Sequence, residues 1–262
     1  MPRSIDKGSL ERLYRIYTKR EYVHPDPIEF LYDYRSVGDR EIAGLVASAL
    51  AYGRVTQILK NVECVLSKAA GPKEFILNSS RGALAKIFSD FCHRFARTDE
   101  LVWLLHGMRR VIEEHGSLNA CFRSFMGRKD ETIVPALTGF VSELNKHSKG
   151  RAGHLIPIPE RGSACKRLNL FLRWMVRRDE VDPGGWRGIK PSQLIVPLDT
   201  HLHRISRELG FTSRRQANMR TAVEITESFK EYAPDDPVRY DFALTRFGIH
   251  PEVRKRRLRA TA

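Results

Sequence analysis

Apolar residues recur at helical spacing along most of this 262-residue chain. Ile42, Leu45, Val46, Ala49 and Leu50 stand at positions i, i+3, i+4, i+7 and i+8, which is the stripe of an amphipathic helix. Similar spacing recurs over 168–175, 202–209 and 219–229, whereas runs that alternate apolar and polar residues are nearly absent. We therefore predict an all-α fold.

Glycine, proline and serine mark where the helices are interrupted. They are frequent in segments 147–163 and 179–197, which we predict to be loops. Between these loops we expect one helix over about 163–178, with Ser163 as its N-cap. Asp236 and Pro237 suit the N-cap and first position of a last helix, which Gly248 would end.

Hydropathy and cysteine usage indicate an intracellular protein. No stretch approaches about 18 consecutive apolar residues, so we predict no membrane span, and the first residues lack the apolar core of a secretion signal. We expect a cytoplasmic, nucleoid-associated protein. The four cysteines lack the clustered spacing of an iron–sulfur site, and we predict buried free thiols. They are Cys64, Cys92, Cys121 and Cys165.

Net charge suggests the class of partner. The chain has 45 lysine and arginine residues against 31 acidic residues, a formal charge of +14 at pH 7. Such a field favours polyanions, either nucleic acid or an anionic membrane surface. A basic protein without a polyanionic partner is the alternative. The basic segment 254–259 could act as an electrostatic arm, and we assign it no function.

A first candidate site lies at the start of the helix predicted over 163–178. Gly162 and Ser163 lead into it, and free amides at a helix N-terminus favour an anion. Lys166 lies in the first turn, and Arg173 and Arg177 share its helical face. We expect this face to meet phosphate, the alternative being a solvated basic face on a core helix.

A second candidate site lies at residues 195–205. Asp199 follows an apolar run and precedes a helix, so a capping role alone would explain it. His201 and His203 are two residues apart, and such neighbours point to different faces of a helix. We therefore predict no metal site.

These two segments together resemble a known superfamily. Leu198-Asp199-Thr200-His201 followed by an amphipathic helix is similar to the signature of the helix-hairpin-helix DNA glycosylases, whose founding type is endonuclease III. The resemblance implies that Asp199 is the catalytic carboxylate, Lys166 the nucleophilic amine and Arg204 the downstream arginine of the signature. Lys166 and Asp199 are 199 − 166 = 33 residues apart, a separation similar to that in archaeal 8-oxoguanine glycosylases.

Segments 163–169, 197–201 and 240–244 also resemble an uncharacterised bacterial family of unknown function over nearly the whole chain. The wider superfamily resemblance covers about 40–250. It implies two helical lobes with a catalytic cleft between them: a central lobe of 35–190, and a second lobe of 1–34 plus 195–262. The segment corresponding to the superfamily hairpin, 156–162, keeps only the last glycine of the usual pattern.

The resemblance also implies a chemistry and a partner. Cleavage of an N-glycosidic bond develops positive charge on the sugar, which a carboxylate stabilises, and a lysine amine can form a Schiff base at C1′. The expected partner is double-stranded DNA with a damaged base, an oxidised guanine being one possibility, bound by a monomer without a cofactor. If both groups serve one sugar, the amine and the carboxylate should lie about 5–8 Å apart.

Further contacts follow from this reaction. The target base must leave the stack, so we expect a pocket with aromatic walls and residues that fill the gap in the duplex. The candidates for these two tasks are Tyr52, Arg54, Gln57, Trp174 and Trp186. The candidates for DNA binding are Gly162, Ser163, Arg167, Arg173, Arg177, His201 and Arg204.

The sequence leaves three functions open. The first is a glycosylase, with or without lyase activity. The second is a non-catalytic nucleic-acid-binding protein on the same scaffold, which the altered hairpin favours. The third is binding to RNA instead of DNA, because net charge does not distinguish the two polymers.

Overall fold

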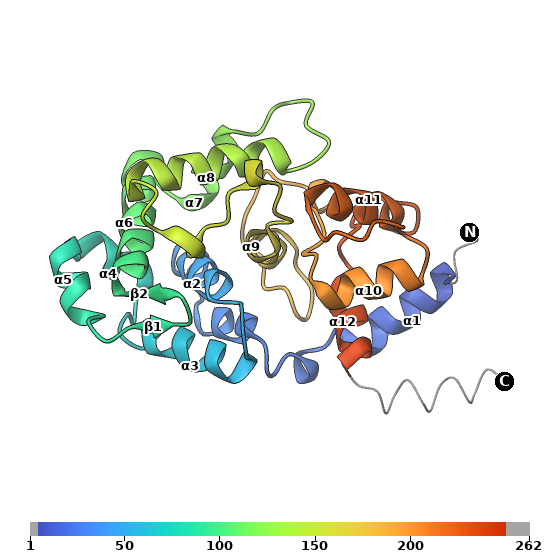
Figure 1. The fold of residues 1–262 in the computed structure, drawn as a ribbon, viewed down its shortest axis with the longest axis horizontal. Coiled ribbons are helices and arrows are strands. Elements are labelled where there is room, and N and C mark those ends of the chain that lie inside the picture. Colours follow the sequence, from blue (N-terminus) through green and yellow to red (C-terminus); the bar gives the residue numbers. More distant parts are fainter. Residues whose placement is uncertain (1–4, 250–262) are drawn as a thin grey trace.

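The computed structural model describes residues 5–249, and nearly all of its regular structure is helical (Figure 1). The α-helices are α1 (Lys7–Tyr17), α2 (Val37–Ala49), α3 (Val55–Leu66), α4 (Pro72–Asn78), α5 (Arg81–Ile87), α6 (Thr98–His115), α7 (Leu118–Ser124), α8 (Val134–Ser148), α9 (Lys166–Val176), α10 (Thr200–Glu208), α11 (Met219–Lys230) and α12 (Asp241–Ile249). Two short strands, β1 (Cys92–His93) and β2 (Ala96–Arg97), pair antiparallel. The all-α prediction is confirmed, and the basic segment 254–259 lies outside the described residues.

Short 3-10 helices connect several of these elements. They are η1 (Arg20–Tyr22), η2 (Pro27–Asp33), η3 (Gly153–Leu155), η4 (Pro159–Arg161) and η5 (Pro191–Gln193). Three of them, η3, η4 and η5, lie within the two segments predicted as loops. Each of those is a single turn, which is typical of 3-10 helices that serve as connectors.

Side-chain caps explain where several helices begin. Asp6 accepts a hydrogen bond from the Ser9 amide at the start of α1, and Ser117 accepts one from the Ala120 amide at the start of α7. Asn218 does the same for α11. Each cap satisfies an amide that the helix itself leaves unpaired.

Helix α9 crosses the middle of the molecule and is seen end-on in Figure 1. Its apolar stripe is buried, and the stripe packs against α2. A Cβ built on Gly44 of α2 would stand 3.3 Å from the Phe171 ring, so the small residue permits this close packing. The stripe consists of Leu168, Phe171, Leu172 and Met175.

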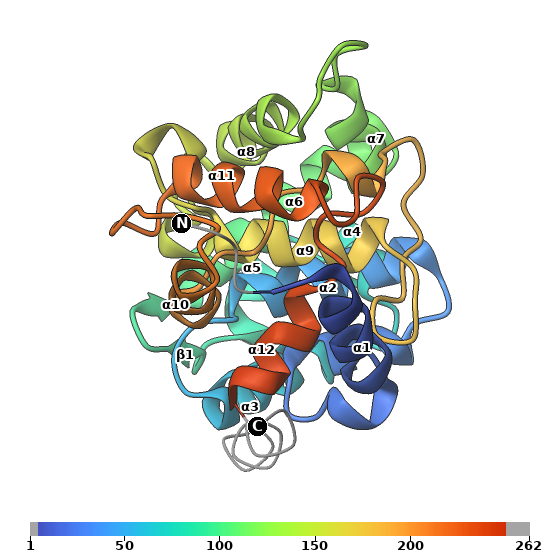
Figure 2. The ribbon, with the colours of Figure 1, turned by 90° about the vertical axis from the view of Figure 1, so that its right-hand side faces the viewer.

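The two ends of the described chain meet. Figure 2 shows α12 lying between α1 and α10, and both helices contact it. The buried apolar residues form a cluster that includes both Leu10 near the N-terminus and Leu244 in α12. The division into lobes at 35–190 and 1–34 plus 195–262 stays a prediction. None of the helices among the described residues has the length and hydropathy that a membrane crossing needs.

Two predicted helix starts were wrong. Helix α9 begins at Lys166 after Cys165, whose φ is +46°, and Ser163 accepts a hydrogen bond from the Cys165 amide instead of capping the helix. Helix α12 begins at Asp241 and extends past Gly248 to Ile249. Its start is later than predicted because the Asp236 carboxylate binds the Arg177 side chain and caps no helix.

The cysteines divide into two pairs by exposure. All four are free thiols, as predicted. Cys121 and Cys165 are buried, but Cys64 and Cys92 are exposed, so the prediction of burial was wrong for these two.

Candidate active site

Asp199 has two tasks, one for each carboxylate oxygen. Oδ1 accepts a hydrogen bond of 2.8 Å from the Leu202 amide, which makes Asp199 the N-cap of α10. Oδ2 lies 3.4 Å from Nζ of Lys166. The capping role that the local sequence indicates is therefore real, and it leaves one oxygen available to the lysine.

Lys166 reaches Asp199 from the first turn of α9. Its side chain is 37% exposed and that of Asp199 is 21% exposed, so both groups remain accessible to solvent. The two groups lie on the same side of the molecule and closer together than the about 5–8 Å expected for a shared sugar. They form a direct ion pair.

Both residues line a cavity of about 350 Å³. The cavity also receives side chains from the segment before η2 and from α3, α9 and α12. Part of its wall is apolar and part is charged. The apolar part includes Pro25, Ile58, Leu170 and Phe242, and the charged part includes Asp26, Arg173, Asp241 and Arg246. We call this space the Lys–Asp cavity.

A buried acid lies beside the ion pair. Asp241 is 5% exposed, lines the Lys–Asp cavity and forms an ion pair with Arg173. Burial raises the pKa of Asp241 to about 6, the Arg173 charge opposes this rise, and the charge of Asp199 adds to it. Asp241 was not among the predicted site residues, although it belongs to the 240–244 segment used for the family resemblance.

Arg173 and Arg177 do not face solvent, which corrects their assignment to DNA binding. Their exposures are 3% and 4%. Arg173 pairs with Asp182 and Asp241, and Arg177 pairs with Asp179, Asp182 and Asp236. Buried charges require such partners, so these arginines hold α9 to the loop after it and to the segment before α12. Lys166, Arg173 and Arg177 were predicted to share one helical face. Lys166 and Arg173 do line the Lys–Asp cavity together, but Arg177 does not line it.

Trp174 and Trp186 belong to the core, which corrects their assignment to a base pocket. Trp174 is fully buried, and its Nε1 has no hydrogen-bond partner among the described residues. Trp186 is also buried, donates from Nε1 to Glu41 and packs edge-on against Phe171. Neither lines the Lys–Asp cavity.

Arg167 connects α9 to two other elements. Its guanidinium donates hydrogen bonds to the Ala49 carbonyl at the end of α2 and to the His154 carbonyl in η3. It also lies 4.8 Å from the centroid of the Tyr52 ring. Two of its donor nitrogens thus have structural partners, which limits what Arg167 can offer to a phosphate.

The predicted hairpin segment borders a second cavity of about 360 Å³. Arg161, Ser163 and Arg167 line it. Gly162 lies between η4 and α9 with φ +77°, a left-handed conformation that disfavours any side chain. A Cβ built there would meet nothing within 4 Å, but the Gly162 N–H donates to the Pro159 carbonyl and the Gly162 carbonyl accepts from the Met219 amide.

The other predicted contacts lie around α10 and α3. His201 is exposed, and Arg204 forms an exposed ion pair with Glu208. Arg54 and Gln57 are exposed. Gln57 donates to Asn61, which also contacts His93, and the Tyr52 hydroxyl donates to the His93 carbonyl. Of the predicted set, the structure brings Lys166 and Asp199 together as an ion pair, with Arg173 in the same cavity wall, and it places Arg167 over the Tyr52 ring.

These observations define an all-α protein with a lysine–aspartate pair at an accessible cavity. A family model described as a protein of unknown function (DUF2400) matches residues 26–250. The match covers most of the chain, and the chain belongs to this family. No curated protein and no solved structure matches it.

Proposed function

We propose that this protein is a DNA-binding base-excision repair enzyme that cleaves the N-glycosidic bond of a damaged base. The observation that carries the proposal is the Lys166–Asp199 pair, with Nζ and Oδ2 3.4 Å apart in the wall of the Lys–Asp cavity. A nucleophile and a carboxylate that serve one sugar carbon must both reach it, and this pair lies closer together than the about 5–8 Å expected with a sugar between them. A two-lobed, glycosylase-like arrangement with a cleft, as the superfamily resemblance implies, is part of the proposal.

The size and lining of the cavity suit one extruded base. Its volume of about 350 Å³ is at the lower end of the range for small-molecule sites, roughly 300–1,000 Å³. Apolar side chains such as Ile58 and Phe242 would contact the faces of the base. Arg246 and Asp26 supply a donor and an acceptor in the same wall. An oxidised guanine is one base of suitable polarity.

The chemistry assigns each member of the pair one role. The Asp199 carboxylate stabilises the positive charge that develops at C1′ as the bond to the base breaks. Lys166 attacks C1′ once it has lost a proton, and the departing base takes the bonding electron pair. The proton that Lys166 loses before the attack goes to solvent, and the proton that the new secondary ammonium loses afterwards goes to the departing base. Ring opening then gives a Schiff base, and loss of a C2′ proton expels the 3′ phosphate if lyase activity accompanies base release.

Backbone binding would come from the surface around this cavity. Residues 161–163 and the N-terminal half of α10 both lie near the ends of the helices that carry the pair. A hollow beside α10 is lined by Thr200, His203, Arg204, Arg207, Arg215 and one acid, Glu208. With a net charge of +14, this surface suits double-stranded DNA, and a monomer associated with the nucleoid fits that partner.

A second candidate function is nucleic-acid binding without catalysis, on DNA or RNA. The direct ion pair favours it, because such a pair joins two helices whether or not a substrate binds. In this alternative the pair only joins α9 to α10.

Borohydride trapping on abasic duplex DNA tests the proposal. Wild-type protein should give a covalent complex, and Lys166→Gln should abolish it. Asp199→Asn should lose base release from duplexes that carry single damaged bases. Lys86→Gln, at an exposed lysine of α5, is the matched control and should trap as well as wild type. Salt-sensitive binding with no trapped complex and no released base in the wild type would support the non-catalytic alternative.

A further inference from the structure

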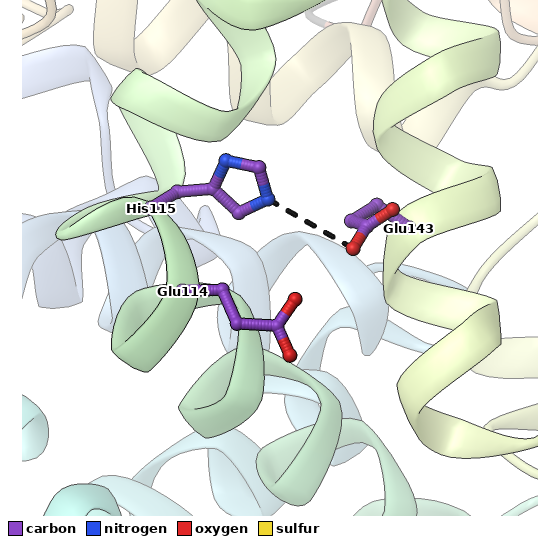
Figure 3. A group of neighbouring side chains, drawn as sticks. All are labelled: Glu114, His115 and Glu143. Atoms are coloured by element: carbon purple, nitrogen blue, oxygen red, sulfur yellow. Dashed lines mark ion pairs between the residues drawn. The ribbon is translucent and has the colours of Figure 1, made fainter.

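A group of imidazole and carboxylate side chains lies between α6 and α8, apart from the Lys–Asp cavity. Glu114 and His115 are in the last turn of α6, and Glu143 is on α8 (Figure 3). One ligand atom from each of these three residues lies within 4.8 Å of the others. None of them lines the Lys–Asp cavity.

The separations suit one metal ion. Nε2 of His115 is 3.8 Å from Oε1 of Glu143. His147 lies next to the group, with its Nε2 3.1 Å from Glu143 Oε1 and 3.2 Å from Glu114 Oε2. Ligand atoms that share a tetrahedral Zn²⁺ at about 2.0–2.1 Å are about 3.3 Å apart. The separations of 3.1, 3.2 and 3.8 Å lie near this value, and the ligand atoms of Glu114, His115 and Glu143 all lie within 4.8 Å of one another.

The two helices hold these side chains in place. Glu143 and His147 are four residues apart on α8, so they share one face. Helix α6 packs tightly on α8, where a Cβ built on Gly107 would stand 3.1 Å from the Leu144 carbonyl oxygen. Helix α6 ends at His115, directly before Gly116 with φ +84°. The end of α6 is therefore fixed opposite the Glu143–His147 face.

The electrostatics of the group favour a cation. Glu114 lies in the last turn of α6, where the negative end of the helix dipole disfavours a carboxylate. Glu143 adds a second negative charge, and its side chain is only 16% exposed. The nearest ammonium, Lys146, lies 3.0 Å from Glu143 and 3.7 Å from Glu114. Its side chain is 63% exposed, so it can move into solvent at little cost.

We propose that Glu114, His115 and Glu143 bind a divalent transition metal of the zinc type, with His147 next to them in contact with both carboxylates. Imidazole and carboxylate groups are ligands that Zn²⁺ accepts, and three protein ligands leave the fourth tetrahedral position open. Bound there, the ion displaces Lys146 and joins the end of α6 to α8. The site does not depend on the function proposed for Lys166 and Asp199.

Co²⁺ titration of the full-length chain tests this site, because tetrahedral Co²⁺ absorbs visible light and Zn²⁺ should displace it. Wild-type protein should bind one ion with a tetrahedral spectrum, and its melting temperature should rise with added Zn²⁺. Removal of even a second-shell partner costs roughly 10–100-fold in metal affinity. His115→Gln and Glu143→Gln should therefore each weaken binding more than about tenfold.

One further variant distinguishes a metal site from a network of ion pairs, and two more serve as a control and as a reserve. Lys146→Ala removes the competing ammonium and should tighten Co²⁺ binding several-fold, whereas it should only weaken a pure ion-pair network. His106→Gln, on α6 but outside the group, should bind as wild type does. Glu114→Gln, at the most exposed of the carboxylates, keeps the test valid if another variant fails to fold. Absence of a tetrahedral Co²⁺ spectrum in the wild type, or its retention in both His115→Gln and Glu143→Gln, would overturn the proposal.

Discussion

Nζ of Lys166 lies 3.4 Å from Oδ2 of Asp199, while Oδ1 of the same aspartate caps α10. One side chain thus fixes the start of a helix and holds the amine of another helix. Because the two tasks use different oxygens, they can be separated by substitution.

Asp199→Asn and Asp199→Ala should differ in stability. Asparagine is as good an N-cap as aspartate, whereas alanine at such a position costs about 0.5–2 kcal/mol. Asp199→Asn should therefore unfold within about 0.5 kcal/mol of wild type, and Asp199→Ala should lose about 1 kcal/mol. Urea unfolding measures both values. Equal stability of the two variants would show that the Leu202 amide finds another partner.

Arg173→Met should be among the most damaging substitutions in α9. It would leave the buried Asp241 without its cation and the buried Asp182 with Arg177 alone. Breaking a buried pair in this way costs about 3–5 kcal/mol. Arg204→Met, which breaks an exposed pair with Glu208, should cost less than about 1 kcal/mol. Chemical unfolding of the two variants side by side tests whether burial makes this difference.

Gly162→Ala should destabilise the protein without any steric clash. The φ of +77° at Gly162 penalises a Cβ, and nothing lies within 4 Å of one. We expect a loss of roughly 1–2 kcal/mol from the left-handed conformation. Gly82→Ala, inside α5, should instead stabilise by about 0.5–1 kcal/mol, because alanine is the better helix former. Thermal unfolding of both alanine variants compares the two positions.

His93 should make the free energy of unfolding depend on pH. Burial lowers the pKa of His93 from its ordinary value of 6.5, although hydrogen bonding to backbone carbonyls opposes the shift. The unfolded chain then binds the proton more tightly than the folded chain does. Stability from this residue is therefore complete above pH 6.5 and is lost as the pH falls toward the folded-state pKa.

His93→Gln provides the comparison for this pH effect. The difference in unfolding free energy between wild type and His93→Gln, measured by urea unfolding at several pH values, isolates the contribution of His93. That difference should shrink as the solution is acidified below pH 6.5. A difference that stays constant from neutral to acidic pH would contradict the shift.

Local sequence patterns predicted the helices well because a helix depends mainly on neighbours within a few residues. The apolar stripe of α9 and the capping role of Asp199 are both of this kind. The same reasoning placed the starts of α9 and α12 too early. Ser163 and Asp236 suit an N-cap, but their side chains bind the Cys165 amide and Arg177 instead.

Site residues were harder to predict because burial depends on what packs over a helical face. Nothing near Arg173 or Arg177 in the sequence shows that Asp236 and Asp241 return to pair with them. The spacing of Glu143 and His147 on α8 is visible in the sequence, and it could have drawn attention to a metal site. The other residues of this group, Glu114 and His115, can be assigned to it only when the structure shows that α6 packs on α8.

The sequence by itself determined the helical class, the basic charge and the presence of a lysine and an aspartate at two helix starts. Each of these follows from composition or from short-range spacing. Only the tertiary structure decided that Lys166 meets Asp199 across 32 intervening residues, and that Arg173 and Arg177 are buried. Such contacts depend on long-range packing, which fixes which side chains lose water and which partners they then need.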